Sequence, residues 1–326
     1  GKRIVFKGVN RHEFDADHGR AMDPALFEQD LIALKRANVN AIRTSHYPNS
    51  SRLYELADIY GFYVIDETNL ETHGTWMKNG ACYPDDETLP NDCNDWEGAV
   101  LDRAKSMLER DKNHPCIVIW SCGNESYGGS ILFHMSEYFR KADPTRLVHY
   151  EGIFWDRRYK ATSDMESQMY PTVADIKKFL SKHREKPFIC CEYTHAMGNS
   201  IGGMHLYTDL TDEDERYQGG FIWDFVDQAI RFRGRYGQDV FGYGGDFGDR
   251  PHDGHFSGDG IVFADRTLTS KLQEVKYNYQ DYTLHVEKDS VRIQNKSLFT
   301  NTEEYELHLE LTLNGTLFWE TTMPAP

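Results

Sequence analysis

The 326-residue sequence has few features that would direct it to nucleic acids or membranes. It has no basic block longer than a few residues, and its net charge of −16 argues against nucleic acid or an anionic lipid surface as a partner. No apolar run approaches the roughly 20 residues of a membrane span, and no signal peptide is visible. Internal repeats and low-complexity tracts are absent as well, so we expect a globular fold without a membrane partner.

The six cysteines form no C-x-x-C pair, which argues against a zinc ribbon or a thioredoxin-like motif. Cys116, Cys190 and Cys191 lie in apolar runs, where a thiol behaves as a small buried hydrophobe. This usage fits the reducing cytoplasm, which we expect as the location. The chain also begins at Gly1, without Met, and enters a strand at once, so we expect it to be a fragment of a longer protein.

Strand and helix signals alternate over residues 1–281. Apolar and β-branched runs predict eight strands, at residues 4–9, 39–43, 62–66, 117–120, 147–151, 164–170, 188–191 and 219–224. Helical stripes lie between several of them, for example after Asp23-Pro24 and from residue 49 to a stop at Gly61. Eight strands that alternate with helices predict a closed parallel (β/α)8 TIM barrel.

The sequence changes character after the eighth predicted strand. Residues 231–260 are rich in glycine, aspartate and aromatics and are long for a loop, which usually indicates function. Short alternating runs at 283–286, 291–293, 305–313 and 316–319 predict antiparallel strands. Because a β-sandwich needs roughly 100 residues, we expect residues 282–326 to be only part of such a domain. The acidic residues 209–215 are expected on the solvated surface.

Two buried predicted strands each lead into a glutamate. Glu125 follows strand 117–120, and Glu192 follows strand 188–191. A carboxylate at the end of a buried strand is costly unless it has a partner or a task, and a single one could cap a helix or pair with an arginine. A parallel barrel brings its strand ends together, so two such residues match the pair of carboxyl groups that glycoside hydrolysis requires.

Seven motifs extend this pattern into a family resemblance. In chain order they are NRHE at 10–13, RTSHYPN at 43–49, ETHG at 71–74, GNES at 123–126, CEYTHAMGNS at 191–200, GGFIWDFVDQ at 219–228 and YGGDFGD at 243–249. Together they resemble the glycoside hydrolase family 2 β-galactosidases over residues 1 to about 281. The resemblance implies a retaining glycosidase that hydrolyses terminal non-reducing β-D-galactosides, such as lactose, through a covalent galactosyl-enzyme. It also implies a homo-oligomeric parent protein.

The resemblance implies a role for each glutamate. Glu192 would be the nucleophile and Glu125 the general acid and then base, with the carboxyl groups about 5–5.5 Å apart. This division requires a lower proton affinity at Glu192 than at Glu125. Arg43, at the end of the second predicted strand, is the expected positive neighbour of Glu192, although a rim salt bridge is the alternative.

The same motifs imply the substrate contacts. His46, Asn124, His195 and Trp223 correspond to contacts of the galactosyl ring, Tyr170 to a partner of the nucleophile, and His12 to a histidine that lines the site. Neutral imidazoles and amides suit hydroxyl recognition, because each offers both a donor and an acceptor.

A metal site is predicted at Glu71 and His73. Residues two apart on an extended segment point the same way, as two ligands must. The resemblance adds Glu125 as a third ligand; oxygen-rich ligation suits Mg²⁺, and one imidazole makes Mn²⁺ an alternative. A hydrogen-bonded Glu-His pair without metal is the other interpretation. The family's sodium site corresponds to Phe256 and Asp259 of this chain. Asp259 replaces an asparagine, and a third ligand belongs to an earlier domain. The resemblance therefore implies only part of a Na⁺ site.

Other functions remain open at this point. One is a different family 2 β-glycosidase, such as a glucuronidase or mannosidase. Others are a non-catalytic carbohydrate-binding module, and a metal-dependent barrel hydrolase that uses Glu71, His73 and His46. The chain alone could also be inactive, because the family builds part of its pocket from preceding domains and neighbouring subunits.

Overall fold

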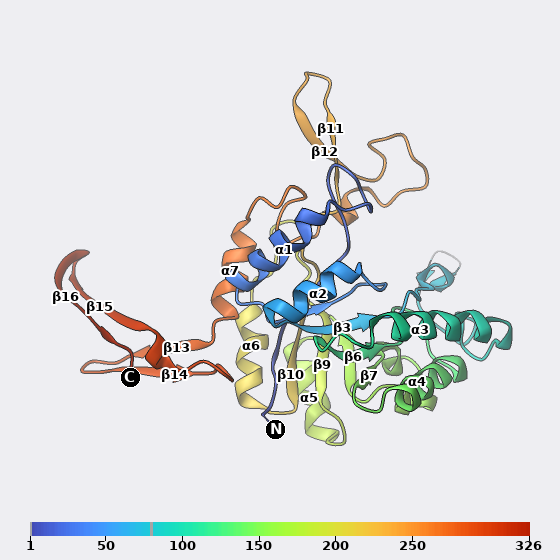
Figure 1. Cartoon of the computed structure of the whole chain (residues 1–326), viewed down its shortest axis with the longest axis horizontal. Coiled ribbons are helices and arrows are strands. Elements are labelled where there is room, and N and C mark those ends of the chain that lie inside the picture. Colours follow the sequence, from blue (N-terminus) through green and yellow to red (C-terminus); the bar gives the residue numbers. More distant parts are fainter. Residues whose placement is uncertain (1, 79–80) are drawn as a thin grey trace. The chain divides into compact units, whose positions relative to one another are not determined.

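The computed structural model describes residues 2–78 and 81–326, which form two compact units (Figure 1). One unit is Ile4–Tyr279, and the other combines Gln280–Pro326 with Lys2 and Arg3. Each unit is described on its own below.

The larger unit is a TIM barrel. Its parallel strands are β1 (Phe6–Asn10), β2 (Ala41–Arg43), β3 (Tyr63–Glu67), β6 (Ile117–Ser121), β7 (Leu147–His149), β8 (Glu166–Met169), β9 (Phe188–Tyr193) and β10 (Tyr217–Ile222). They pair in the order β7-β6-β3-β2-β1-β10-β9-β8. Every strand expected from the sequence is therefore present, with ends that differ by at most two residues, and the predicted fold is confirmed.

The barrel has one seam, between β7 and β8, where no strand ladder forms among the described residues. Instead, the backbone N–H of Asp164 donates to the Val148 carbonyl at 2.8 Å. The His149 Nε2 and Ser167 Oγ atoms lie 2.8 Å apart across the same seam. These bonds join the two edges, so the ring is nearly closed.

Seven α-helices belong to the described part of this unit. They are α1 (Pro24–Arg36), α2 (Ser51–Tyr60), α3 (Glu97–Asp111), α4 (Ser130–Ala142), α5 (Val173–Lys182), α6 (Met204–Glu213) and α7 (Ser270–Asn278). As expected, the Asp23 side chain caps α1 at Ala25 N, and Gly61 ends α2 with φ of 69°. Between β7 and β8 the connection holds only the 3₁₀ helices η3 (Glu151–Phe154) and η4 (Arg157–Thr162).

Strand alternation divides the barrel interior into an apolar layer and a polar layer. Ala41, Ile65, Ile119, Met165, Ile189 and Phe221 form one buried hydrophobic cluster. Two residues further along their strands lie Arg43, Glu67, Ser121, Ser167, Cys191 and Trp223. Because side chains two apart point the same way, the polar set occupies the carboxyl-terminal mouth above an apolar floor.

Two segments differ from the simplest sequence interpretation. The glycine-rich region is not one long loop, because it begins with a hairpin of β11 (Ile230–Arg233) and β12 (Asp239–Gly242) and includes the 3₁₀ helix η5 (Gly254–Ser257). The acidic run lies largely on helix α6, where Asp209, Asp212 and Glu213 are exposed as expected.

The smaller unit contains two antiparallel hairpins. One pairs β13 (Tyr282–Val286) with β14 (Val291–Asn295), and the other pairs β15 (Glu306–Leu313) with β16 (Thr316–Pro324). The four predicted strands are thus found, while their membership of a β-sandwich domain stays a prediction. No helix among residues 2–78 and 81–326 is long and apolar enough to cross a membrane.

Candidate active site

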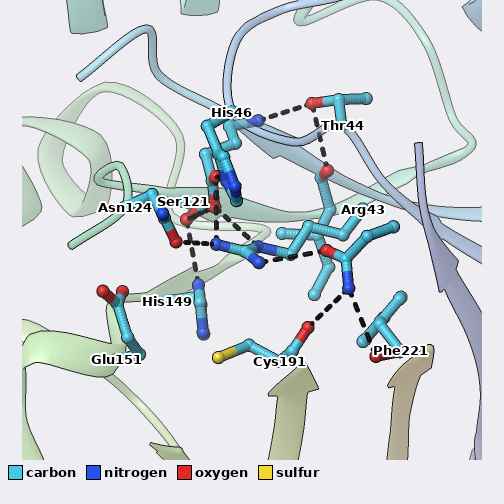
Figure 2. A network of polar contacts seen from close by, with 12 residues as sticks. Arg43, Thr44, His46, Ser121, Asn124, His149, Glu151, Cys191 and Phe221 are labelled. Carbon is cyan, nitrogen blue, oxygen red and sulfur yellow. Dashed lines mark hydrogen bonds and ion pairs between the residues drawn. The ribbon is translucent and has the colours of Figure 1, made fainter. Parts of the chain in front are cut away.

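The Arg43 guanidinium lies at the centre of a network of polar side chains (Figure 2). It uses all five of its N–H donors. Its Nε and Nη2 atoms donate to the two oxygens of Glu67 at 2.8 and 3.0 Å. Its Nη1 donates to Asn10 Oδ1 at 3.0 Å and to Glu192 Oε1 at 2.9 Å, and its Nη2 also donates to Asn124 Oδ1 at 2.7 Å. One buried cation therefore connects side chains from β1, β3 and β9 and from the segment after β6.

This arrangement brings the two predicted catalytic glutamates to the same mouth. Glu192 contacts Arg43 directly, and Glu125 directly follows Asn124, which contacts the same guanidinium. Tyr170 completes the environment of Glu192, because its hydroxyl donates to Glu192 Oε2 at 2.7 Å. Tyr170 and Glu125 both have positive φ, 53° and 36°, a costly backbone conformation that often occurs where a side chain is aimed for function.

Glu125 has the electrostatics of a general acid. Burial, the charge of Glu192 and the charge of Glu71 together raise the pKa of Glu125 to about 9, so it is protonated at neutral pH. Its backbone N–H donates to Glu151 Oε1 at 2.7 Å, which holds the peptide in place. Burial also raises the pKa of Glu151, to about 8, against the opposing charge of Arg43.

Glu67 is a functional residue that the sequence analysis missed. It is fully buried, and besides Arg43 it accepts hydrogen bonds from Ser121 Oγ at 2.7 Å and contacts His46 Nδ1 at 2.8 Å. Burial alone would raise the pKa of Glu67, but the charge of Arg43 and the His46 hydrogen bond outweigh it and lower the pKa to about 2. Glu67 is therefore an anion at neutral pH that holds Arg43 and His46 in position.

The three predicted metal ligands lie together. The ligand atoms of Glu71, His73 and Glu125 are all within 4.8 Å of one another, a donor set that fits a divalent cation. His73 Nδ1 is 3.7 Å from Glu125 Oε2, and Asn124 Nδ2 donates to Glu71 Oε2 at 2.8 Å. Asn124 thus links this cluster to Arg43 through its other amide atom.

The predicted substrate-contact residues surround the polar layer. Trp223 stacks on His46 with ring centroids 5.1 Å apart, and His12 meets both rings edge-on. On the other side, the His195 ring lies 5.8 Å from Tyr170 and 6.1 Å from Phe256. Burial is the main cause that lowers the pKa of His12 and of His195, so both rings are neutral near pH 7.

Asp259 supports Trp223 by accepting the indole N–H at 2.7 Å on Oδ2. Its Oδ1 and the Oδ1 of Asp224 are buried and have no hydrogen-bond partner among the described residues. Phe256, the other predicted sodium residue, is 60% exposed. Sodium binding at this place stays a prediction.

The positions of Glu67 and Glu151 in the sequence indicate that both are candidates for the site. Glu67 lies two residues after the inward-facing Ile65, and Glu151 closes a predicted strand. An inward-facing carboxylate at the carboxyl end of a barrel strand is in the place where catalytic residues are found. Ser121 likewise lies two residues after the buried Ile119, and its Oγ is 2.9 Å from His149 Nδ1.

Comparisons with known proteins identify the family of the chain. The chain belongs to glycosyl hydrolases family 2, whose TIM barrel domain model matches residues 1–284. It is 55% identical over 316 residues to a β-galactosidase of Halalkalibacterium halodurans, covering 97% of this chain and 31% of that protein. It is 53% identical to a β-galactosidase of Clostridium acetobutylicum, with 97% and 35% covered. The chain thus spans about a third of the length of these relatives.

Among solved structures, the barrel resembles β-glucuronidase from Ruminococcus gnavus, with a TM-score of 0.64 and 18% identity over 85% of this chain and 50% of that one. A β-galacturonidase from Eisenbergiella tayi has a TM-score of 0.61 and 20% identity, with 86% and 51% covered. At this level of identity the likeness supports the fold alone.

Proposed function

We propose that this chain carries the catalytic centre of a β-galactosidase that hydrolyses terminal non-reducing β-D-galactosides such as lactose. The observation that carries the proposal is the position of the Arg43 guanidinium, which donates both to Glu192 and to Asn124, the residue before Glu125. The names of the relatives at 53–55% identity supply the substrate class.

In the first step, Glu192 attacks the anomeric carbon while Glu125 gives its proton to the departing glycosidic oxygen. The carbon–oxygen bond to the leaving group breaks, and a galactosyl ester forms on Glu192. Arg43 and Tyr170 hold the Glu192 carboxylate in position, because both donate to its oxygens. In the second step Glu125, now a carboxylate, takes a proton from the water that attacks the same carbon, and Glu192 leaves as a carboxylate.

Glu71, His73 and Glu125 would hold a divalent cation, with Mg²⁺ the best match to two carboxylates and one imidazole and Mn²⁺ the alternative. A bound cation supplies positive charge beside Glu125 and so tunes its proton affinity. His46, His195, Asn124 and Trp223 would contact the galactosyl ring, with His12 behind them. The homo-oligomeric state of the parent protein and its cytoplasmic location are further proposals of the same reasoning.

The test is covalent labelling of the longest natural polypeptide that contains this sequence. A 2-deoxy-2-fluoro-galactoside should add one fluorogalactosyl group to Glu192, which peptide mass spectrometry locates, and Glu192→Gln should abolish both label and turnover. Glu55→Gln, at an exposed position on α2, is the matched control and should keep both. Label that persists in Glu192→Gln would contradict the assignment, and faster turnover of nitrophenyl glucuronide or mannoside would contradict the substrate class.

A further inference from the structure

A pocket of about 580 Å³ opens beside Glu125. Its aromatic lining comes from Trp76, Phe154, Trp155, Tyr170 and Phe179. Of the residues proposed to contact the galactosyl ring, neither His46 nor His195 nor Trp223 lines it. Within the described residues, the pocket therefore extends from the general acid on a side that the proposed galactosyl contacts do not occupy.

The aromatic side chains pack as a group but leave part of their surface open. The rings of Phe154 and Trp155 are 5.0 Å apart at 78°, and those of Trp76 and Trp155 are 6.1 Å apart at 72°. Trp76 is almost buried, whereas Trp155 is 48% and Phe154 43% exposed. Large apolar side chains that remain half-exposed beside a catalytic carboxyl group are available to a ligand.

The segment that carries these rings is tied to the general acid. Helix η3 begins with Glu151, which accepts the backbone N–H of Glu125 at 2.7 Å. Gly152 follows, and a Cβ at that position would come within 2.3 Å of the Tyr127 carbonyl, so only glycine allows this approach. The Trp155 N–H then bonds to the Gly152 carbonyl at 3.0 Å, which fixes the turn. Phe154 and Trp155 are thus held at a set place relative to Glu125.

The position of the acid determines what enters the pocket. A general acid must lie within hydrogen-bond reach of the oxygen that it protonates, so the leaving group sits on the Glu125 side of the bond that breaks. A flat aromatic ring suits the C–H face of a pyranose, because it excludes water from apolar surface without demanding a fixed hydroxyl pattern.

We propose that Phe154 and Trp155, with Trp76 behind them, form the platform for the leaving sugar and for an acceptor sugar in galactosyl transfer. This inference rests on the proposed function. In transfer, an acceptor hydroxyl oxygen attacks the anomeric carbon of the galactosyl ester, and its proton passes to Glu125. The bond to Glu192 breaks, and its electron pair returns to the Glu192 carboxylate, so the products are a disaccharide and free enzyme.

The experiment measures how the galactosyl-enzyme partitions between hydrolysis by water and transfer to an acceptor sugar. The longest natural polypeptide that contains this chain is given nitrophenyl galactoside and a fixed concentration of glucose, and the ratio of disaccharide to galactose is measured by chromatography. Trp155→Ala and Phe154→Ala should each lower this ratio about tenfold, the effect of losing one stacking contact. Trp155→Phe should restore much of it, because a flat ring returns.

Two controls make the result decisive. Trp96→Ala removes an equally exposed tryptophan, 48% exposed, that does not line the pocket, and should leave the ratio unchanged. Urea unfolding of Trp155→Ala and Phe154→Ala should match that of the parent, which reports an intact fold. Galactose release without glucose should stay within about twofold of the parent in Trp96→Ala. An unchanged ratio in both alanine variants overturns the platform while the proposed function stands. A parent protein that releases no galactose overturns the proposed function and the platform with it.

Discussion

Arg43→Lys is the substitution for which the structure gives the sharpest expectation. Lysine keeps the positive charge but has three donors instead of five. The five acceptors around Arg43 belong to Glu67, Glu192, Asn10 and Asn124, and all four residues are at most 5% exposed. At least two of these five bonds are therefore lost, in a place that water reaches poorly.

Each lost hydrogen bond from the buried, charged guanidinium costs about 1–3 kcal/mol, so Arg43→Lys should lower the free energy of unfolding by about 2–6 kcal/mol. Urea unfolding followed by circular dichroism measures this loss. Arg52→Lys is the matched control, because Arg52 bonds to Glu55 at 3.0 Å with both side chains about half exposed, and it should cost no more than about 0.5 kcal/mol.

The same substitution should also reduce turnover, because Glu192 loses its fixed partner on one oxygen. If Arg43→Lys unfolds at the same urea concentration as the parent and hydrolyses galactosides at the same rate, the five-donor arrangement is not what holds the site together. A loss of stability without a loss of rate would contradict only the positioning of Glu192.

Three further predictions follow from the site. Tyr170→Phe removes the 2.7 Å bond to Glu192 and should lower kcat about tenfold to a hundredfold, measured by steady-state kinetics, with an unchanged kcat as the contrary result. The pKa of Glu67 is lowered from 4.5 to about 2. Its ionised form therefore stabilises the folded protein fully above pH 4.5, and this contribution is lost as the pH falls towards 2. At about 1.36 kcal/mol per pH unit, the loss is about 3 kcal/mol. Stability measured across this pH range should fall further in the parent than in Glu67→Gln, and parallel curves would refute the assignment. Removal of divalent cations with a chelator should lower activity and Mg²⁺ should restore it, whereas an enzyme indifferent to chelation has no functional metal at Glu71 and His73.

Much of the barrel could be predicted because its strands are short, apolar and regularly spaced along the chain. Even the polar strand at 164–170 was found, as β8. Helices α6 and α7 were not named in advance, because α6 buries only Met204 and Leu210 and α7 only Leu272 and Val275. Two buried residues in a short helix give too weak a period to separate it from a loop.

Site residues that belong to a recognisable motif could be predicted from the sequence. Site residues whose only signal is the face of a strand on which they lie could not. The motifs led to Glu125, Glu192 and Arg43, which the structure brings together. Glu67 and Glu151 lie outside the quoted motifs, and their importance depends on which neighbours their strands meet. Those neighbours depend on which strands pair in the barrel and in what register, and a single sequence does not specify the pairing.

The seam between β7 and β8 has a consequence for how the barrel moves. Elsewhere neighbouring strands are joined by repeated main-chain ladders, but here the edges are joined by separate bonds, two between Val148 and Asp164 and one between the His149 and Ser167 side chains. Amide protons beside the seam should exchange with solvent sooner than those of β1 or β10, since fewer bonds must open at once. The aromatic segment η3 starts two residues beyond β7, so the wall of the proposed sugar platform belongs to the part of the ring that loosens first.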